Sequence, residues 1–201
     1  MPSKVQICNR ALSTYVGDAR IVSLSEDTAQ AKECALHYED TLKSLLEMHW
    51  WNFSTGRQIM ASEVNDRTDE WAYKYAAPAD ALSIRWVNSA PTARLLRAQG
   101  LSPDVEREFT GSHIYCDVAQ ATCEFTSKSD DPTVYPQFFA DALSAMLATQ
   151  ICLPLVQDRV RLENAVRAAE TLFDKAVSLD SRNTPPVVAG APDWFRSRGI
   201  S

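Results

Sequence analysis

The stretch His49-Trp50-Trp51-Asn52-Phe53 stands out from the helical pattern that precedes it. Each large aromatic ring can bury roughly 150–250 Å² of surface, so a cluster of them is costly to leave in water. The run therefore marks either a packed corner of the core or a surface that meets a partner. We expect the packed corner, at the point where a helical region passes into a β-rich one. The residues that build this aromatic corner are then Trp50, Trp51, Phe53 and Tyr75.

Two helices are predicted before the aromatic run. The first covers residues 3–16, with Ser3 as its N-cap and Gly17 at its end. The second extends from about residue 27 to 50, because its apolar residues alternate at steps of four and three. That spacing is typical of a helix that packs along one side.

Between residues 60 and 135 the helical period disappears, and turn-forming residues become frequent. Two of the β-prone runs there are predicted to form a hairpin that sets Cys116 opposite Cys123. The β-prone runs are Trp71 to Ala76, Ser83 to Val87, His113 to Cys116 and Thr122 to Phe125.

Helical spacing returns at Pro136, where a third helix is apolar on more than one face and is expected to be central. A fourth helix is predicted over residues 157–179. The expected fold is mainly α: a four-helix bundle (1–59 and 136–180) with a β-rich insertion (60–135) between its second and third helices. Residues 1–180 form a single domain in this interpretation, and residues 181–201 form an extended C-terminal tail.

Composition narrows the class of protein. Hydrophobic residues make up 45% and charged residues 23% of the 201 residues, which indicates a globular chain. A net charge of -6 disfavours a sequence-independent grip on nucleic acid, which requires clustered Lys and Arg. No apolar run is expected to be long enough to cross a membrane, and the first residues resemble a helix rather than a signal peptide. We expect a protein made in a cytosol, with five scattered thiols.

Catalytic motifs are missing from the sequence. It contains no Gly-rich phosphate loop, no GxSxG and no HExxH. An incomplete metal site at His113, Cys116 and Cys123 is the weaker alternative to structural roles for these residues. Cys34 and Cys152 are expected to fill the core, although Cys34 or Cys116 near His113 would be the nucleophile if the protein were an enzyme. We expect no enzyme, no metal and no cofactor.

The C-terminal tail carries aromatic and basic residues without helical or strand spacing. Aromatic side chains with no core to join are typical anchors for a partner's groove, with arginines at the rim. The expected partner-binding residues are Pro185, Pro186, Trp194, Phe195, Arg196 and Arg198.

The order of these patterns resembles a known family. The pattern combines the helix with Ala11-Leu12, the link from Ile21 to Glu26, the aromatic run, a Tyr-x-x-Pro-x-Asp-x-Leu turn from Tyr75 to Leu82, and the helix after Pro136. Together they resemble the head-to-tail adaptors of tailed bacteriophages, of the tail tubular protein A type. The resemblance extends over residues 5–180 except the stretch 88–111, and it is a pattern of apolar and aromatic positions.

The resemblance implies a structural virion protein at the head–tail junction, synthesised in the cytoplasm of a bacterial host. Similar proteins form a ring of twelve subunits under the portal, retain the packaged DNA and receive the virion tail or nozzle. DNA would pass through the ring without sequence-specific binding, and the C-terminal tail would contact the portal. The alternative is a small helical interaction or regulatory protein with no role in a virion.

Overall fold

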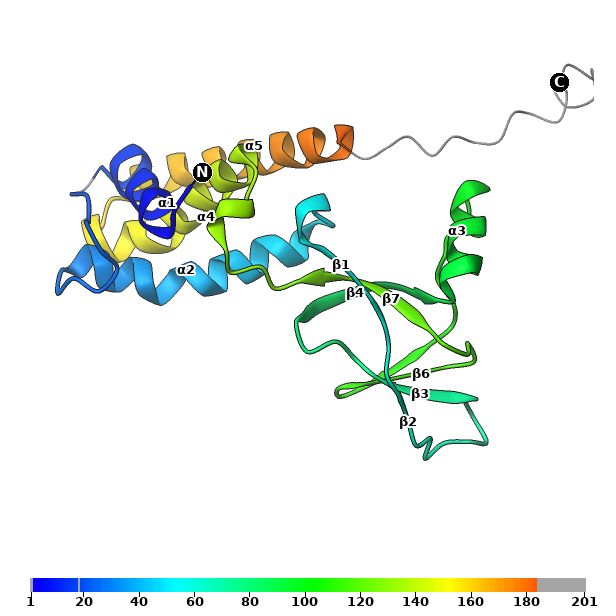
Figure 1. The fold of residues 1–201 in the computed structure, drawn as a ribbon. Helices are drawn as coiled ribbons and strands as arrows, with labels where there is room; N and C mark the ends of the chain where they lie inside the picture. Colours follow the sequence, from blue (N-terminus) through cyan, green and yellow to red (C-terminus); the bar gives the residue numbers. More distant parts are fainter. Residues whose placement is uncertain (1, 18, 184–201) are drawn as a thin grey trace, which may run out of the picture. The chain divides into compact units, whose positions relative to one another are not determined.

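The computed structural model describes residues 2–17 and 19–183 (Figure 1). The described chain divides into two compact units. Among the described residues, the helical unit comprises residues 2–17, 19–54 and 128–183, and the β unit comprises Thr55–Ser127. We describe each unit by itself.

The helical unit begins with α1 (Lys4–Arg10), which continues as the π-helical turn η1 (Ala11–Val16). Ser3 accepts a hydrogen bond from the Gln6 backbone N–H, and the Gln6 side chain bonds the Ser3 N–H in return. Gly17 ends the segment with φ +74°, a conformation that suits glycine. The predicted first helix, its N-cap and its end are therefore confirmed.

The remaining helices of this unit are longer. α2 starts after Thr28, whose hydroxyl caps the Ala31 N–H, and α5 starts after Asp158, which caps Val160 and Arg161. The bounds are α2 (Ala29–Met48), η2 (Asn52–Ser54), η3 (Pro132–Val134), α4 (Gln137–Val156) and α5 (Arg159–Arg182).

Helix α4 lies at the centre of the helical unit. It packs against α1, η1, α2 and α5, and ten of its residues, including Phe139, Leu143 and Ile151, are buried. The predicted central position of this helix is confirmed. By length and composition α4 is also the one helix of the described residues that could cross a membrane, although more than half of its apolar window is buried inside the structure. The expectation that no such run exists was wrong, but a core helix passes the same test.

The β unit contains two antiparallel sheets, with strand orders β1-β7-β4 and β2-β3-β6-β5. Their shared core includes Tyr75, Val87, Ile114 and Phe125. A short helix, α3 (Ala90–Ala98), follows β4. The strands are β1 (Thr55–Ile59), β2 (Ser62–Glu63), β3 (Tyr73–Ala76), β4 (Ala81–Asn88), β5 (Glu108–Thr110), β6 (His113–Cys116) and β7 (Thr122–Ser127).

The predicted four-helix bundle is wrong. The described residues form five α-helices and two antiparallel sheets, with 51% helix and 18% strand, which is a mixed α/β fold. The sequence pattern missed α3 and underestimated the sheets because β1, β2 and β5 are short and largely exposed strands without alternating apolar residues. Hydrogen bonds to partner strands hold such strands in place, so the pattern of apolar residues along them does not reveal them.

The predicted hairpin around residues 118–121 is also wrong. β6 pairs with β3 and β5, whereas β7 pairs with β1 and β4 in the other sheet. Cys116 is opposite Tyr73, and Cys123 is opposite Gln58 and Val87, so the two cysteines are not cross-strand neighbours. Both are free thiols. Two strands adjacent in sequence usually pair, and here each finds a different sheet.

Candidate functional site

The aromatic corner is built around Trp51, which is 0% exposed. Its indole N–H donates a hydrogen bond of 2.8 Å to the carbonyl of Leu45, six residues earlier in the last turn of α2. The centroid of its ring lies 5.0 Å from the ring centroid of Phe139 and 6.2 Å from that of Phe173, and both pairs are edge to face. Trp51 thus fixes the end of α2 against α4 and α5, since such edge-to-face pairs add to the burial of the rings.

Asp180, in the last turn of α5, closes this corner. Its side chain is almost fully buried and accepts hydrogen bonds from the Asn52 backbone N–H and from Asn52 Nδ2, both at 3.1 Å. Its own carbonyl accepts from Asn52 Nδ2 at 2.8 Å, and His49 Nε2 lies 3.4 Å from Oδ2. No sequence signal points to Asp180, because no local pattern connects positions 128 residues apart.

The other predicted corner residues lie in different surroundings. Phe53 is half-buried, with its ring 4.7 Å from Phe139. Trp50 is 60% exposed. Tyr75 belongs to the β unit, where its hydroxyl donates to the Val118 carbonyl at 2.7 Å. Trp51 and Phe53 therefore share one cluster, Tyr75 belongs to another, and Trp50 presents most of its ring to the surface.

The predicted portal-binding residues lie outside the described residues. This applies to the whole set Pro185, Pro186, Trp194, Phe195, Arg196 and Arg198. Of the predicted C-terminal tail, residues 181 and 182 belong to α5 and Asn183 is its C-cap.

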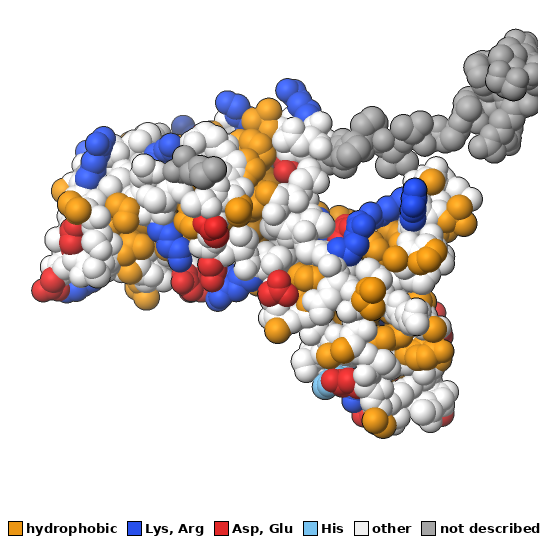
Figure 2. All heavy atoms as spheres, viewed as in Figure 1, with side chains coloured by type: hydrophobic (Ala, Val, Ile, Leu, Met, Phe, Trp, Pro, Cys, Tyr) orange, Lys and Arg blue, Asp and Glu red, His pale blue; other side chains and the backbone are white. Residues whose placement is uncertain are grey.

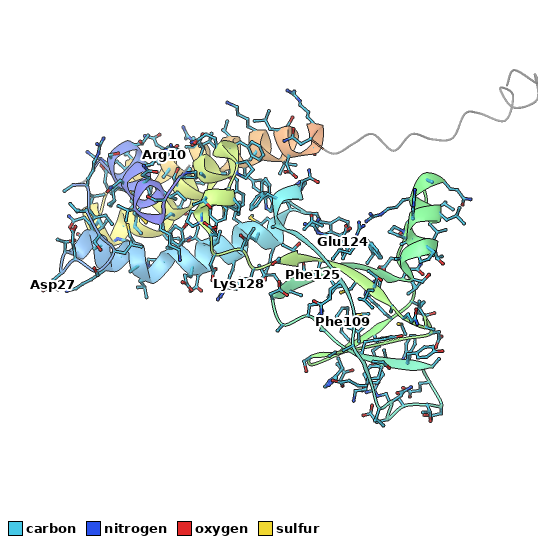
Figure 3. The ribbon with its side chains drawn as sticks, in the orientation of Figure 1. Arg10, Asp27, Phe109, Glu124, Phe125 and Lys128 are labelled. Atoms are coloured by element: carbon cyan, nitrogen blue, oxygen red, sulfur yellow. The ribbon has the colours of Figure 1, made fainter. Side chains whose placement is uncertain are left out.

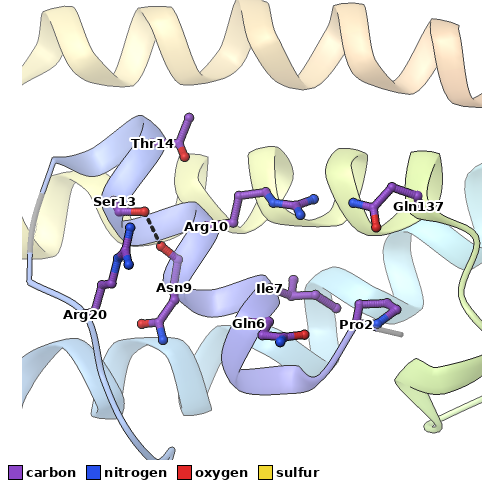
Figure 4. A pocket seen from close by; sticks show the side chains of 9 residues that line it. All are labelled: Pro2, Gln6, Ile7, Asn9, Arg10, Ser13, Thr14, Arg20 and Gln137. Carbon is purple, nitrogen blue, oxygen red and sulfur yellow. Dashed lines mark hydrogen bonds between the residues drawn. The ribbon is translucent and has the colours of Figure 1, made fainter.

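A polar groove of about 590 Å³ opens beside α1 and η1 (Figure 4). Arg10 in its wall forms an ion pair with Asp141, and the Ser13 hydroxyl donates to the Asn9 carbonyl at 2.7 Å. The Asn9 side chain holds the backbone of Ile21 through two hydrogen bonds of 2.8 Å. Its polar groups therefore hold the chain in place, which favours a structural role. The lining residues are Pro2, Gln6, Ile7, Asn9, Arg10, Ser13, Thr14, Arg20 and Gln137.

A second polar cluster lies on the β unit, and we call Arg57, Trp86, Arg97 and Glu124 the Arg–Trp–Glu cluster. Arg57 Nη2 donates to Glu124 Oε2 at 2.6 Å, and Arg97 Nη2 donates to Oε1 at 3.0 Å. The two guanidinium groups also approach the Trp86 ring, at 5.6 and 4.8 Å from its centroid. These distances suit cation–π contacts, so one carboxylate and one indole hold two arginines.

Burial and hydrogen bonds act in opposite directions on the carboxylate of this cluster. Glu124 is 8% exposed, and burial alone would raise its pKa. The hydrogen bonds from Arg57 and Arg97 outweigh burial, so the pKa of Glu124 is lowered from its ordinary value. The Trp86 indole N–H is buried and forms no hydrogen bond of acceptable geometry with a described residue, although its nearness to Glu124 contributes to the lowered pKa.

The cysteines and His113 are the residues that the sequence offers for a nucleophilic or metal centre. Burial raises the pKa of the Cys123 thiol to about 11 and also raises that of Cys116, so both stay protonated at neutral pH. A hydrogen bond with Cys8 lowers the pKa of Cys34, and the Cys34 residue is 0% exposed. His113 Nε2 lies 3.0 Å from Glu63 Oε2. In the described part of the chain no group of three His, Cys, Asp or Glu could hold a metal ion.

Comparison with known proteins leaves the family open: no protein-family model matches this chain, and no curated protein matches it.

Proposed function

We propose that this protein is a structural head-to-tail adaptor of a tailed bacteriophage, assembled as a ring under the portal. The observation that carries the proposal is the sequence resemblance over residues 5–180, except the stretch 88–111. The run His49–Phe53, which is central to the resemblance, has an architectural role: Trp51 and Asn52 fix the end of α2 to α4 and α5. A signature of packing residues suits a scaffold better than an enzyme.

Two exposed apolar side chains support a role in assembly. Met48, the last residue of α2, is 59% exposed, and Trp50, two residues beyond it, is 60% exposed. Trp is among the residues that contribute most to protein interfaces. Trp50 is therefore a candidate contact between neighbouring subunits, held in place by the buried Trp51 beside it.

The net charge also suits the proposed ring. Each chain carries -6, so twelve copies would carry a large negative charge. A lumen lined by part of this charge would repel the phosphate backbone and let DNA slide through. A reconstruction that shows a lumen lined mostly by Lys and Arg would refute this part of the proposal.

Ring assembly on the portal tests the adaptor role directly. The purified chain is mixed with the portal protein encoded by the same virus, and particles are examined by electron microscopy. We expect an added twelve-subunit ring. If no ring forms and the gene lies away from portal and capsid genes, the adaptor role is wrong and a small interaction protein is the better description.

The C-terminal tail is tested in the same assay. Replacing Trp194 and Phe195 with Ala should abolish ring addition, because large aromatics anchor such docking segments. The matched control replaces Val187 and Val188 with Ala in the same segment and should retain the ring. Ring addition by both variants would contradict the role of the tail while leaving the adaptor role intact.

A further inference from the structure

The strand register places three side chains of the Arg–Trp–Glu cluster in one row. Glu124 on β7 is opposite Arg57 on β1 and opposite Trp86 on β4. The next residue, Phe125, leaves the other face of β7 and enters the core (Figure 3). Successive residues of a strand point to opposite faces, so this sheet has one apolar face and one charged face.

The charged face gathers most of the positive charge of the β unit. Residues 55–127 contain seven Lys and Arg and ten Asp and Glu, a net charge of -3. Arg85 joins the same face at an irregularity of β4, donating to the hydroxyls of Thr126 and Thr55. Arg57 and Arg97 bond Glu124 directly. Arg94, also from α3, lines one pocket with both of them, so four of the seven cations belong to this region of the β unit. Figure 2 shows Lys and Arg side chains gathered beside α3.

A pocket of about 290 Å³ opens on this face. Three arginines, the indole and two small apolar side chains surround it: Arg57, Arg94, Arg97, Trp86, Ala90 and Ala93. Glu124 engages a single nitrogen of Arg57 and of Arg97, and a guanidinium group has five N–H donors. Arg94 is exposed and has no ion-pair partner among the residues that the structure describes.

We propose that this pocket binds a carboxylate on a short apolar stem, namely a glutamate side chain of a partner protein. Arg57 and Arg97 already hold one carboxylate, so their guanidinium groups are fixed in position for a second, with Arg94 at the rim. Ala90, Ala93 and the indole would contact the stem.

A glutamate fits better than a nucleic-acid phosphate. The β unit has a net charge of -3 and the chain -6, which disfavours a polyanion. A single carboxylate responds mainly to charges within the screening length of about 8–10 Å. The charged side chains that line the pocket are the three arginines. This inference does not rest on the adaptor role, since any acidic partner segment would satisfy it.

Nuclear magnetic resonance titration of the ¹⁵N-labelled full-length protein at low ionic strength tests the proposal. The probe is N-acetyl-Ala-Glu-Ala-amide, which carries one carboxylate, and the control peptide has Gln in place of Glu. The indole N–H signal of Trp86, assigned with Trp86→Phe, should shift saturably with the Glu peptide alone. The shift should weaken in 0.5 M salt, since charge attraction is screened.

Matched variants locate the site. Arg94→Gln should weaken binding of the Glu peptide at least about fivefold, because it removes one charge-assisted donor from an exposed position. Arg159→Gln removes an arginine that is also exposed, from the helical unit, and should leave binding unchanged. An equal response to both peptides, equal loss in both variants, or no saturable shift would overturn the proposal. So would a shift produced only by a DNA duplex and abolished by Arg94→Gln, which would identify a phosphate site.

Discussion

At the scale of single residues, buried polar side chains connect segments that are far apart in sequence. Asp180 holds Asn52 across 128 positions, and Glu124 holds Arg57 and Arg97 across 67 and 27 positions. A buried carboxylate needs such partners, because an unpaired one is strongly disfavoured. Both acids therefore connect distant segments of their own unit, Asp180 in the helical unit and Glu124 in the β unit.

Asp180→Ala should lower the free energy of unfolding by about 1–3 kcal/mol, because the Asn52 N–H and side chain lose their buried acceptor. Chemical denaturation followed by Trp fluorescence measures the change. Asp174→Ala, at an exposed position of the same helix, is the control and should cost less than about 0.5 kcal/mol. Equal losses of unfolding free energy in the two variants would contradict a stabilising role of the Asp180–Asn52 hydrogen bonds.

Glu124→Gln should destabilise the protein by about 1–3 kcal/mol at pH 7. The folded-state pKa of Glu124 is lowered, so its contribution is present above the ordinary value of 4.5 and is lost as the pH falls through the lower folded value. The stability difference between wild type and variant should therefore shrink below about pH 4.5. Denaturation between pH 3 and 7 checks this, with the exposed Glu106→Gln as control. A difference that does not change with pH would contradict the ion-pair account.

At the scale of elements, β1 shows how a strand without apolar spacing is fixed by its neighbour. It pairs along its whole length with β7, and Gly56 lies beneath the Phe125 ring. A Cβ atom on Gly56 would come within 2.5 Å of that ring, far inside van der Waals contact. The glycine is therefore required for the close approach of β1 to Phe125.

Gly56→Ala should reduce stability by about 1–3 kcal/mol, because the Phe125 ring must move within a packed core. Thermal unfolding by circular dichroism measures the loss. Gln58→Ala, at an exposed position of the same strand, should change stability by less than about 0.5 kcal/mol. Comparable effects of the two substitutions would show that strand propensity, and not the contact with Phe125, dominates.

At the scale of the whole molecule, the β unit begins and ends at neighbouring positions. Thr55 at the start of β1 is the register partner of Thr126 near the end of β7. The chain therefore enters and leaves this unit through adjacent strands. It also has its own core, which is the requirement for independent folding.

Residues 55–127, expressed alone, should fold cooperatively, because the two sheets share one core. These 73 residues also exceed the size below which isolated domains become rare. Dispersed ¹H–¹⁵N spectra and a single thermal transition are the expected readouts. The complementary variant replaces residues 55–127 with Gly-Gly-Ser and should retain the far-ultraviolet helical signal of the remaining chain. A disordered spectrum of the isolated fragment would show that the β unit depends on the rest of the protein.

The sequence by itself determined the local elements of the helical unit. Ser3, Gly17 and the apolar faces of the helices act within a few residues of one another, so their spacing predicts the elements. The tertiary structure alone decided the two sheets, the separation of Cys116 from Cys123, and the long-range hydrogen bonds of Asp180 and Glu124. The physical reason is range: a helix bonds to itself, whereas strand pairing and buried ion pairs depend on partners elsewhere in the chain.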